Sequence, residues 1–209
     1  MIIENFWVFA LTALLLNLTP GNDMVYVAAR STSQGSKAGI VSSVGIMLGC
    51  MVHIVAAMAG LSAIIASSAL AFDIIKYIGA AYLIYLGICS LISKRKTMHP
   101  HTAIKKRSLS NIFWQGVLTN VLNPKVALFF LAFLPQFINV KESNTALQIF
   151  FLGTWFNIGG TLVNILVSLL FGKAGKWLSS SPKFIQWQER ITGTILIALG
   201  IKVALSSKK

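Results

Sequence analysis

Two long apolar runs that are interrupted by proline constrain the fold of this chain more than any other feature. The first interruption reads Leu16-Asn17-Leu18-Thr19-Pro20-Gly21-Asn22-Asp23, and the second reads Asn120-Val121-Leu122-Asn123-Pro124-Lys125. Proline lacks an N–H and crowds the carbonyl four residues earlier, so it begins a helix more readily than it continues one. Thr19 and Asn123, directly before the prolines, are residue types that cap helix N-termini. Each run therefore predicts two half-helices that meet inside a hydrophobic stretch.

The breaks at Pro20 and Pro124 free backbone carbonyls, to which lipid offers no hydrogen-bond donor. Such breaks are tolerated in a membrane only beside protein or a water-filled cavity. In transporters, broken helices at membrane depth mark the binding site. A charged residue stands close to each break, Asp23 at the first and Lys125 at the second. We therefore expect the two breaks to form the substrate site.

The composition is typical of an integral membrane protein. The chain is 56% hydrophobic and only 11% charged, whereas soluble proteins average about 25% charged residues. Its 209 residues have room for roughly six spans of about 20 residues each. The runs expected to span the membrane are 6–29, 39–66, 72–92, 112–138, 146–171 and 191–205. We expect a single transmembrane domain over residues 1–209, with no soluble domain beside it.

The chain has a net charge of +13, and most of its lysines and arginines fall in the segments between the apolar runs rather than along one face of a helix. This is the positive-inside pattern of membrane proteins, and it argues against a nucleic-acid partner. Most basic residues, including those of the polar loop 93–111, fall on one side of a six-span topology. The other side holds Lys76, Lys141, Lys202, Lys208 and Lys209. The basic loops are therefore expected to be cytoplasmic, with both termini outside.

An internal repeat relates the two halves of the chain. Thr19-Pro20 corresponds to Asn123-Pro124, and the same spacing pairs Gly49 with Gly153 and His53 with Asn157. Each half would hold three spans, so the second half must enter the membrane from the opposite face. The predicted fold is an all-α integral membrane protein with six transmembrane helices, arranged as two inverted three-helix repeats with broken first helices. Repeat one covers about 1–92 and repeat two about 112–209.

Several motifs, in order along the chain, resemble one known family. They are Thr19-Pro20-Gly21-x-Asp23, the glycines Gly35, Gly39, Gly45 and Gly49, the segment Gly79–Gly87, Phe113-x-x-Gly116, Asn120-x-x-Asn123-Pro124-Lys125, and Leu134-Pro135-Gln136-Phe137. Together they resemble the LysE/RhtB family of amino-acid exporters over nearly the whole chain. The resemblance implies proton-driven efflux of amino acids such as homoserine, threonine or leucine across a bacterial inner membrane. In one departure, Asn22 replaces the second proline of the usual Pro-Gly-Pro-Asp.

Asp23 and Lys125 are the charged candidates for the site. An aspartate near the bilayer centre costs about 2.5–3.5 kcal/mol on insertion scales, so it pairs, takes up a proton or faces water. We expect Asp23 to attract a substrate ammonium and to exchange a proton, or else merely to complement a positive helix N-terminus. Lys125 is expected to hold a substrate carboxylate together with free amides of Gly21 and Asn22. Its alternatives are an internal ion pair with Asp23 or a position at the membrane interface.

The uncharged candidates are amides and one histidine. Asn17, Asn120 and Asn123 are expected to meet the carbonyls freed by the prolines, with substrate contact as the alternative. His53 and Asn157 fit packing and hydrogen bonding, with proton relay by the histidine as the alternative.

Two other function classes are weighed against export. Cys50 and Cys89 lie in different predicted spans without CxxC spacing, which disfavours a membrane-embedded redox carrier. Metal or cation efflux would require several carboxylates, and Asp23 is the only acid expected at membrane depth. There is no GxxxxGK[ST] motif, so ATP is not expected to drive transport directly. We expect a transporter rather than an enzyme, without cofactor or metal, whose partners are an amino-acid substrate, protons and the lipid bilayer. A homo-oligomer is left open.

Overall fold

The computed structural model describes residues 6–61, 69–92, 106–139, 144–180 and 182–205, and its elements there are all helical. The first run forms α1 (Phe6–Leu18) and α2 (Asn22–Gln34), and the second forms α3 (Ser36–Ala56) and a π-helical turn, η1 (Ala57–Leu61). The third run is α5 (Ala69–Ile92). The fourth comprises α6 (Leu109–Val121), α7 (Pro124–Leu128), the π-helical η2 (Phe129–Phe133) and the 3₁₀ turn η3 (Leu134–Phe137). The last two runs are α8 (Thr145–Ser180) and α9 (Pro182–Leu205).

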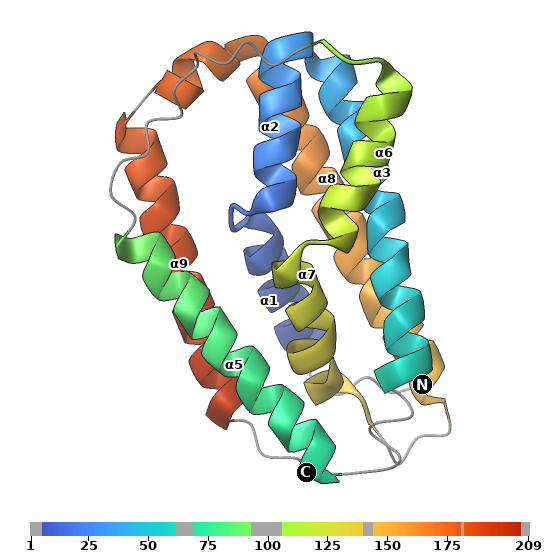
Figure 1. Ribbon diagram of the computed structural model, residues 1–209. Helices are drawn as coiled ribbons and strands as arrows, with labels where there is room; N and C mark the ends of the chain where they lie inside the picture. The colour runs from blue at the N-terminus through green and yellow to red at the C-terminus, as the bar shows by residue number, and fades with distance from the viewer. Residues whose placement is uncertain (1–5, 62–68, 93–105, 140–143, 181, 206–209) are drawn as a thin grey trace.

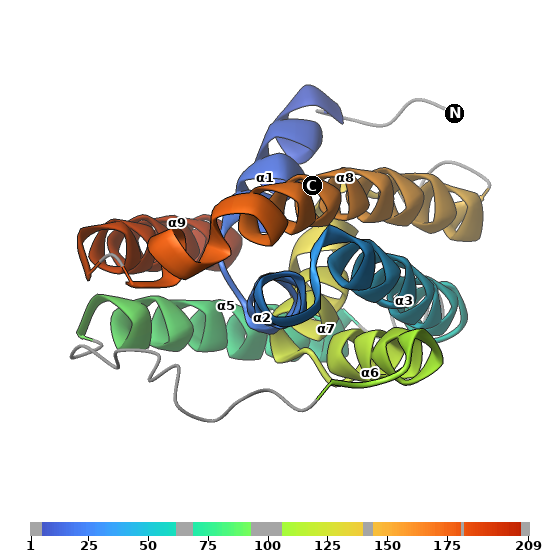
Figure 2. The same cartoon turned by 90° about the horizontal axis from the view of Figure 1, so that it is seen from above.

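Successive runs cross the bundle in alternating directions (Figure 1). α3 packs against both α6 and α8, and α5 packs along α9. Seen from above, α8 and α9 form one row, while α5, α2 and α6 lie in a second row (Figure 2). α2 and α7 lie in the middle of the bundle, whereas α6 lies along the outer side of α3 and α1 packs against α8 (Figure 2). Thr19 and Asn123, next to the two prolines, are buried, so the two breaks face the interior.

Both proline-interrupted runs are bent, as predicted. The axes of α1 and α2 differ by 47°, and α6 meets the helix that begins at Pro124 at 43°. Asn123 caps α7 as expected, because its Oδ1 accepts a hydrogen bond from Lys125 N at 3.0 Å. The expectation that Thr19 caps the other half-helix is wrong, since α2 begins at Asn22. The Thr19 hydroxyl instead donates to Leu15 O at 2.8 Å, a bond within α1 that competes with capping.

The described residues hold two helices that are long and apolar enough to cross a membrane, or four spans if each bent pair counts as one. The two are Ser36–Gly60 and Thr145–Lys173. Six spans were expected. Within the described residues, α5 contributes a shorter apolar helix, Lys76–Ile92, and α9, whose first half carries Gln186, Gln188, Glu189 and Arg190, is not among the spans. Both helices nevertheless run alongside each other through the bundle (Figure 1).

The segment between the fifth and sixth predicted runs is largely helical. α8 continues as helix to Ser180, and α9 begins at Pro182, because the stretch between Phe171 and Pro182 contains no proline that would end the helix earlier. Residues 93–105 of the predicted basic loop, residues 62–66 of the second run, and Lys141, Lys208 and Lys209 lie outside the described residues.

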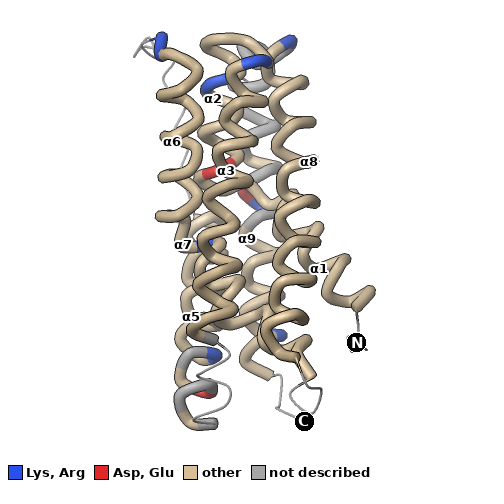
Figure 3. Tube along the Cα trace, turned by 90° about the vertical axis from the view of Figure 1, so that its right-hand side faces the viewer, with Lys and Arg blue, Asp and Glu red and all other residues tan. Residues whose placement is uncertain are grey.

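Lysines and arginines gather at the two ends of the bundle, and charged residues are sparse between them (Figure 3). At the end where α2 stops and α6 starts, Arg30 is 7% exposed and its Nη2 donates to Gln115 Oε1 at 2.9 Å. The Tyr26 hydroxyl donates to Ile112 O at 2.8 Å. These contacts tie α2 to α6 on one side of the breaks.

Glycines bring α3 and α6 into close contact. A Cβ on Gly45 would overlap the carbonyl oxygen of Phe113, and a Cβ on Gly116 would lie 2.7 Å from Ser42 O. Gly49 faces Val117 O, which a Cβ would approach to 2.6 Å. Small residues allow helix backbones to approach in this way in membranes. The contact fixes the position of α6, and with it the second break.

We predict that Gly45→Ala destabilises the protein by about 1–3 kcal/mol, since the added methyl group must push α3 and α6 apart. Thermal unfolding in detergent micelles measures this as a lower melting temperature. Gly60→Ala is the matched control, because no described atom lies within 4 Å of a Cβ built there. Equal melting temperatures for the two variants would contradict the packing described.

Candidate functional site

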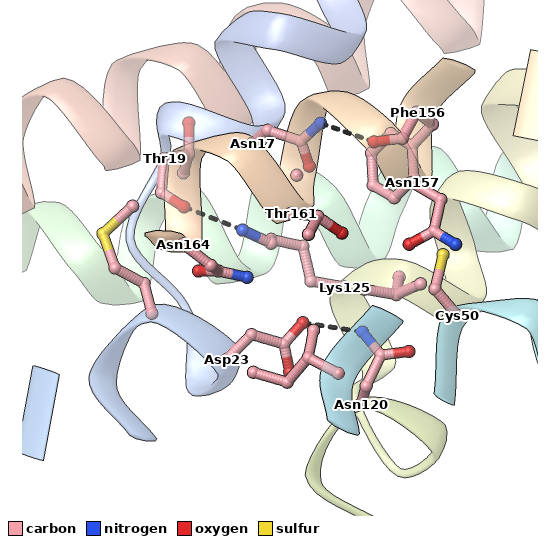
Figure 4. A pocket seen from close by; sticks show the side chains of 14 residues that line it. Asn17, Thr19, Asp23, Cys50, Asn120, Lys125, Phe156, Asn157, Thr161 and Asn164 are labelled. Carbon is pink, nitrogen blue, oxygen red and sulfur yellow. Dashed lines mark hydrogen bonds between the residues drawn. The ribbon is translucent and has the colours of Figure 1, made fainter. Parts of the chain in front are cut away.

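A cavity of about 30 Å³ lies where the two breaks meet (Figure 4). This volume suits one or two water molecules and is too small for a whole amino acid. Its walls come from α1, α2, α3, α6, α7 and α8. They are lined by Asn17, Thr19, Asp23, Met24, Ile46, Cys50, Asn120, Lys125, Val126, Phe156, Asn157, Gly160, Thr161 and Asn164.

Asp23 enters this cavity from the first turn of α2 and pairs with Asn120 of α6. Its Oδ2 accepts a hydrogen bond from Asn120 Nδ2 at 2.8 Å, and its Oδ1 is buried without a partner. Asn120 is only 2% exposed, and its Oδ1 is likewise buried without a partner. The pair therefore leaves two hydrogen-bond acceptors unused beside the cavity, a situation that is costly unless a ligand or water supplies donors.

Lys125 reaches from α7 across the cavity to the end of α1 (Figure 4). Its Nζ donates to Thr19 O at 2.8 Å and to Leu16 O at 3.2 Å. Leu16 O is the carbonyl that loses its regular helical donor, because the residue four positions later is Pro20. The second break thus supplies an ammonium to the first. Among the described residues no ion pair joins Asp23 and Lys125.

The remaining amides hold helices together. Asn17 Nδ2 donates to Phe156 O of α8 at 3.0 Å, and Asn157 Nδ2 donates to Met47 O of α3 at 3.1 Å. Both residues line the cavity. Asn123 caps α7 through its oxygen, while its Nδ2 is buried without a partner.

Four predicted residues, Gly21, Asn22, His53 and Asn123, are not among those that line the cavity. His53 Nε2 lies 3.0 Å from Asn120 O, and its ring stacks on Phe130 with centroids 6.0 Å apart. The histidine therefore positions the end of α6. Gly21 lies directly beside the lysine, since a Cβ on it would be 3.0 Å from Lys125 Nζ.

The sequence analysis missed Thr161 and Asn164, which line the cavity from α8. Together with Asn157 they stand at positions i, i+4 and i+7 of one helix, so they share a face. A polar stripe of this spacing along an apolar helix was the signal that could have found them. Thr161 Oγ1 is buried and has no hydrogen-bond partner.

Phenylalanines close the cavity on the side of α7. The Phe156 ring, which lines the cavity, stacks on Phe129 with centroids 4.1 Å apart. Phe130 and Phe133 pack on Phe129 in turn. Three of these rings belong to η2, and π-helical turns often occur at functional sites. Aromatic rings thus lie on one side of the breaks, and the Tyr26–Arg30–Gln115 contacts lie on the other.

The described residues contain no group of three or more His, Cys, Asp or Glu side chains placed to hold a metal ion. Cys50 is buried on the wall formed by α3, and Cys89 lies on α5. Both thiols are free.

Two broken helices that enclose a buried polar cavity define a multi-pass membrane transporter. The family model of the LysE type translocator matches residues 14–207, and the chain belongs to this family. The predicted family resemblance is thereby confirmed, and with it the prediction of a transporter rather than an enzyme.

Three relatives match over nearly their full lengths. The uncharacterized membrane protein YrhP of Bacillus subtilis is 35% identical over 93% of this chain and 95% of its own. The leucine efflux protein of an Enterobacter species is 26% identical, covering 96% of this chain and 95% of its own. The homoserine/homoserine lactone efflux protein of Salmonella typhimurium is 29% identical over 98% of both chains. No solved structure matches the chain.

We predict that Asn120→Ala lowers the free energy of unfolding by about 1–3 kcal/mol, because Asp23 Oδ2 would lose its buried donor. Thr161→Val serves as the comparison, since the hydroxyl that it removes makes no hydrogen bond. Melting temperatures in detergent should fall for the first variant and stay unchanged for the second. The reverse order would refute the described hydrogen bonding.

Proposed function

We propose that this protein exports amino acids and related small zwitterions by alternating access, coupled to protons. One observation carries the proposal: an acid and an amine, Asp23 and Lys125, face the same cavity from different helix breaks without pairing to each other. A zwitterion can satisfy both. Family membership and relatives named as leucine and homoserine efflux proteins support the same substrate class.

The substrate ammonium is assigned to Asp23 and Asn120. An ammonium carries three N–H donors and no acceptor, and these two residues hold two buried oxygens that lack donors. Bonds between an ammonium and a carboxylate are about twice as strong as neutral ones. Loading the site would therefore satisfy acceptors that the empty cavity leaves unused.

The substrate carboxylate is assigned to the N-terminus of α2 and to Lys125. No side chain caps α2, so the backbone amides around Gly21 and Asn22 are available to an anion at the positive end of the helix. Lys125 Nζ lies beside Gly21, which places a cation next to the same amides. We assign Asn17, Asn123, Asn157 and His53 to positioning the helices, because their hydrogen bonds are with backbone groups.

The small size of the cavity supports alternating access. At about 30 Å³ it cannot admit an amino acid unless helices separate at one end. The aromatic rings around Phe129 and the polar contacts around Gln115 lie on opposite sides of the breaks. Separating one set of contacts while the other stays intact would expose the site to one side of the membrane at a time.

We further propose six spans arranged as two inverted repeats, with the basic loops in the cytoplasm of a bacterial cell. The alternating directions of successive runs support this arrangement (Figure 1). So does the pairing of equivalent helices, α3 with α8 and α5 with α9, and the similar bends of 47° and 43°. A proton that moves through 100 mV provides about 2.3 kcal/mol, enough to drive export. Asp23 is the proposed proton-exchanging group.

We predict that Asp23→Asn slows export at least about tenfold, because a charge-assisted bond worth about 1.5–3 kcal/mol is lost. The measurement is efflux of labelled leucine or homoserine from loaded proteoliposomes, with and without a pH gradient. Asp73→Asn is the matched control, since this acid pairs with Lys76 at 3.3 Å and does not line the cavity. An Asp23→Asn variant with the wild-type rate and the same response to the gradient would refute the role of Asp23.

A further inference from the structure

The ammonium of Lys125 fills a specific place in the empty site. It bridges Thr19 O and Leu16 O at the C-terminal end of α1, which is the negative end of that half-helix. Thr19 N is the other donor near Leu16 O, at 3.2 Å. Transporters with broken helices coordinate small cations at such unwound carbonyls. Here a side chain of the protein occupies the position that a free cation would take.

The ammonium of Lys125 lies directly beside Gly21. A side chain on Gly21 would meet Lys125 Nζ at 3.0 Å and Lys125 Cε at 3.2 Å, so the glycine makes room for the lysine. The break is thus built around this amine (Figure 4). Asp23, the other charged group of the cavity, is bonded to Asn120 instead.

We infer that Lys125 is a tethered cation that allows the empty carrier to change its access without a bound substrate. This inference rests on the proposed function. In the empty cavity, Lys125 balances the charge of Asp23 and donates hydrogen bonds to the carbonyls of Leu16 and Thr19 at the first break. In the loaded cavity the substrate brings an ammonium of its own. Without the lysine, the empty carrier would have no cation beside Asp23 and the carbonyls of the first break, whereas the loaded carrier would still have the substrate ammonium.

Export into a substrate-free medium requires the empty carrier to return, whereas exchange of substrate for substrate does not. If Lys125 acts on the return of the empty carrier, its substitution changes net efflux more than exchange. If its role were purely structural, both rates would change together. Because Lys125 is also assigned to the substrate carboxylate, we expect Lys125→Met to lower both rates, and at saturating substrate to lower net efflux about tenfold more than exchange, the additional effect of losing a charge-assisted bond in the empty carrier. The ratio of the two rates does not depend on how much protein is folded.

The experiment uses proteoliposomes loaded with labelled leucine or homoserine and diluted into buffer with or without the same unlabelled amino acid. Lys76→Met is the matched control, because Lys76 is 5% exposed on α5, pairs with Asp73 and does not line the cavity. Its ratio should equal that of the wild type. Should Lys125→Met fail to fold, Lys125→Arg replaces it, and this variant should keep the wild-type ratio because it keeps the cation.

A ratio of net efflux to exchange about tenfold below that of the wild type in Lys125→Met would support the tethered cation. The tethered cation would be overturned if folded Lys125→Met lost net efflux and exchange in equal proportion, or if neither rate changed. A ratio of net efflux to exchange that is tenfold lower in Lys125→Arg would overturn it as well. Failure of the proposed function looks different, because the wild-type protein would then move neither amino acid in either assay.

Discussion

The structure depends on how two interrupted helices are satisfied where lipid provides no hydrogen-bond donors. The second break is satisfied locally, since Asn123 caps the helix that begins at Pro124. The first break has no such cap, and its carbonyls are bonded by Lys125 from the second break. One half of the chain therefore completes the other. Lys125 takes part in both breaks, because its backbone N–H is bonded to Asn123 and its ammonium to the carbonyls of Leu16 and Thr19.

This arrangement determines the chemistry of the cavity. Because Lys125 is turned towards α1, Asp23 is bonded by an amide rather than by a cation. An acid and a base thus face one small space with their charges apart, which is the pattern that a zwitterion complements. The glycine contact between α3 and α6 and the His53 contact with Asn120 O keep the second break in the position that this requires.

Sequence reasoning located the breaks, the helical architecture and the candidates Asp23 and Lys125, because proline and buried charge have strong local effects. Asn120 was expected to meet a carbonyl freed by proline, whereas its amide donates to Asp23. Sequence reasoning could not show which way Lys125 points, since that depends on the packing of α7 against α1. It predicted that α2 starts at Pro20, whereas α2 starts at Asn22, because the Thr19 hydroxyl is bonded to Leu15 O of α1 and does not cap α2. Thr161 and Asn164 were within reach of helical periodicity, whereas Met24 and Ile46 were not, because apolar side chains carry no sign of facing a cavity.

The central claim is that the cavity between the breaks receives both charged groups of one substrate molecule. Cys50 reports on it directly, since it lines the cavity, whereas Cys89 does not. The most direct measurement is the rate at which Cys50 of a Cys89→Ala protein reacts with a small thiol reagent in the presence of leucine, its deaminated acid or its decarboxylated amine. We predict that leucine protects Cys50 from the reagent in a saturable manner, and that either analogue protects it only a little. If Cys50 reacted equally fast with each of the three compounds present and with none of them, the cavity would not be the substrate site.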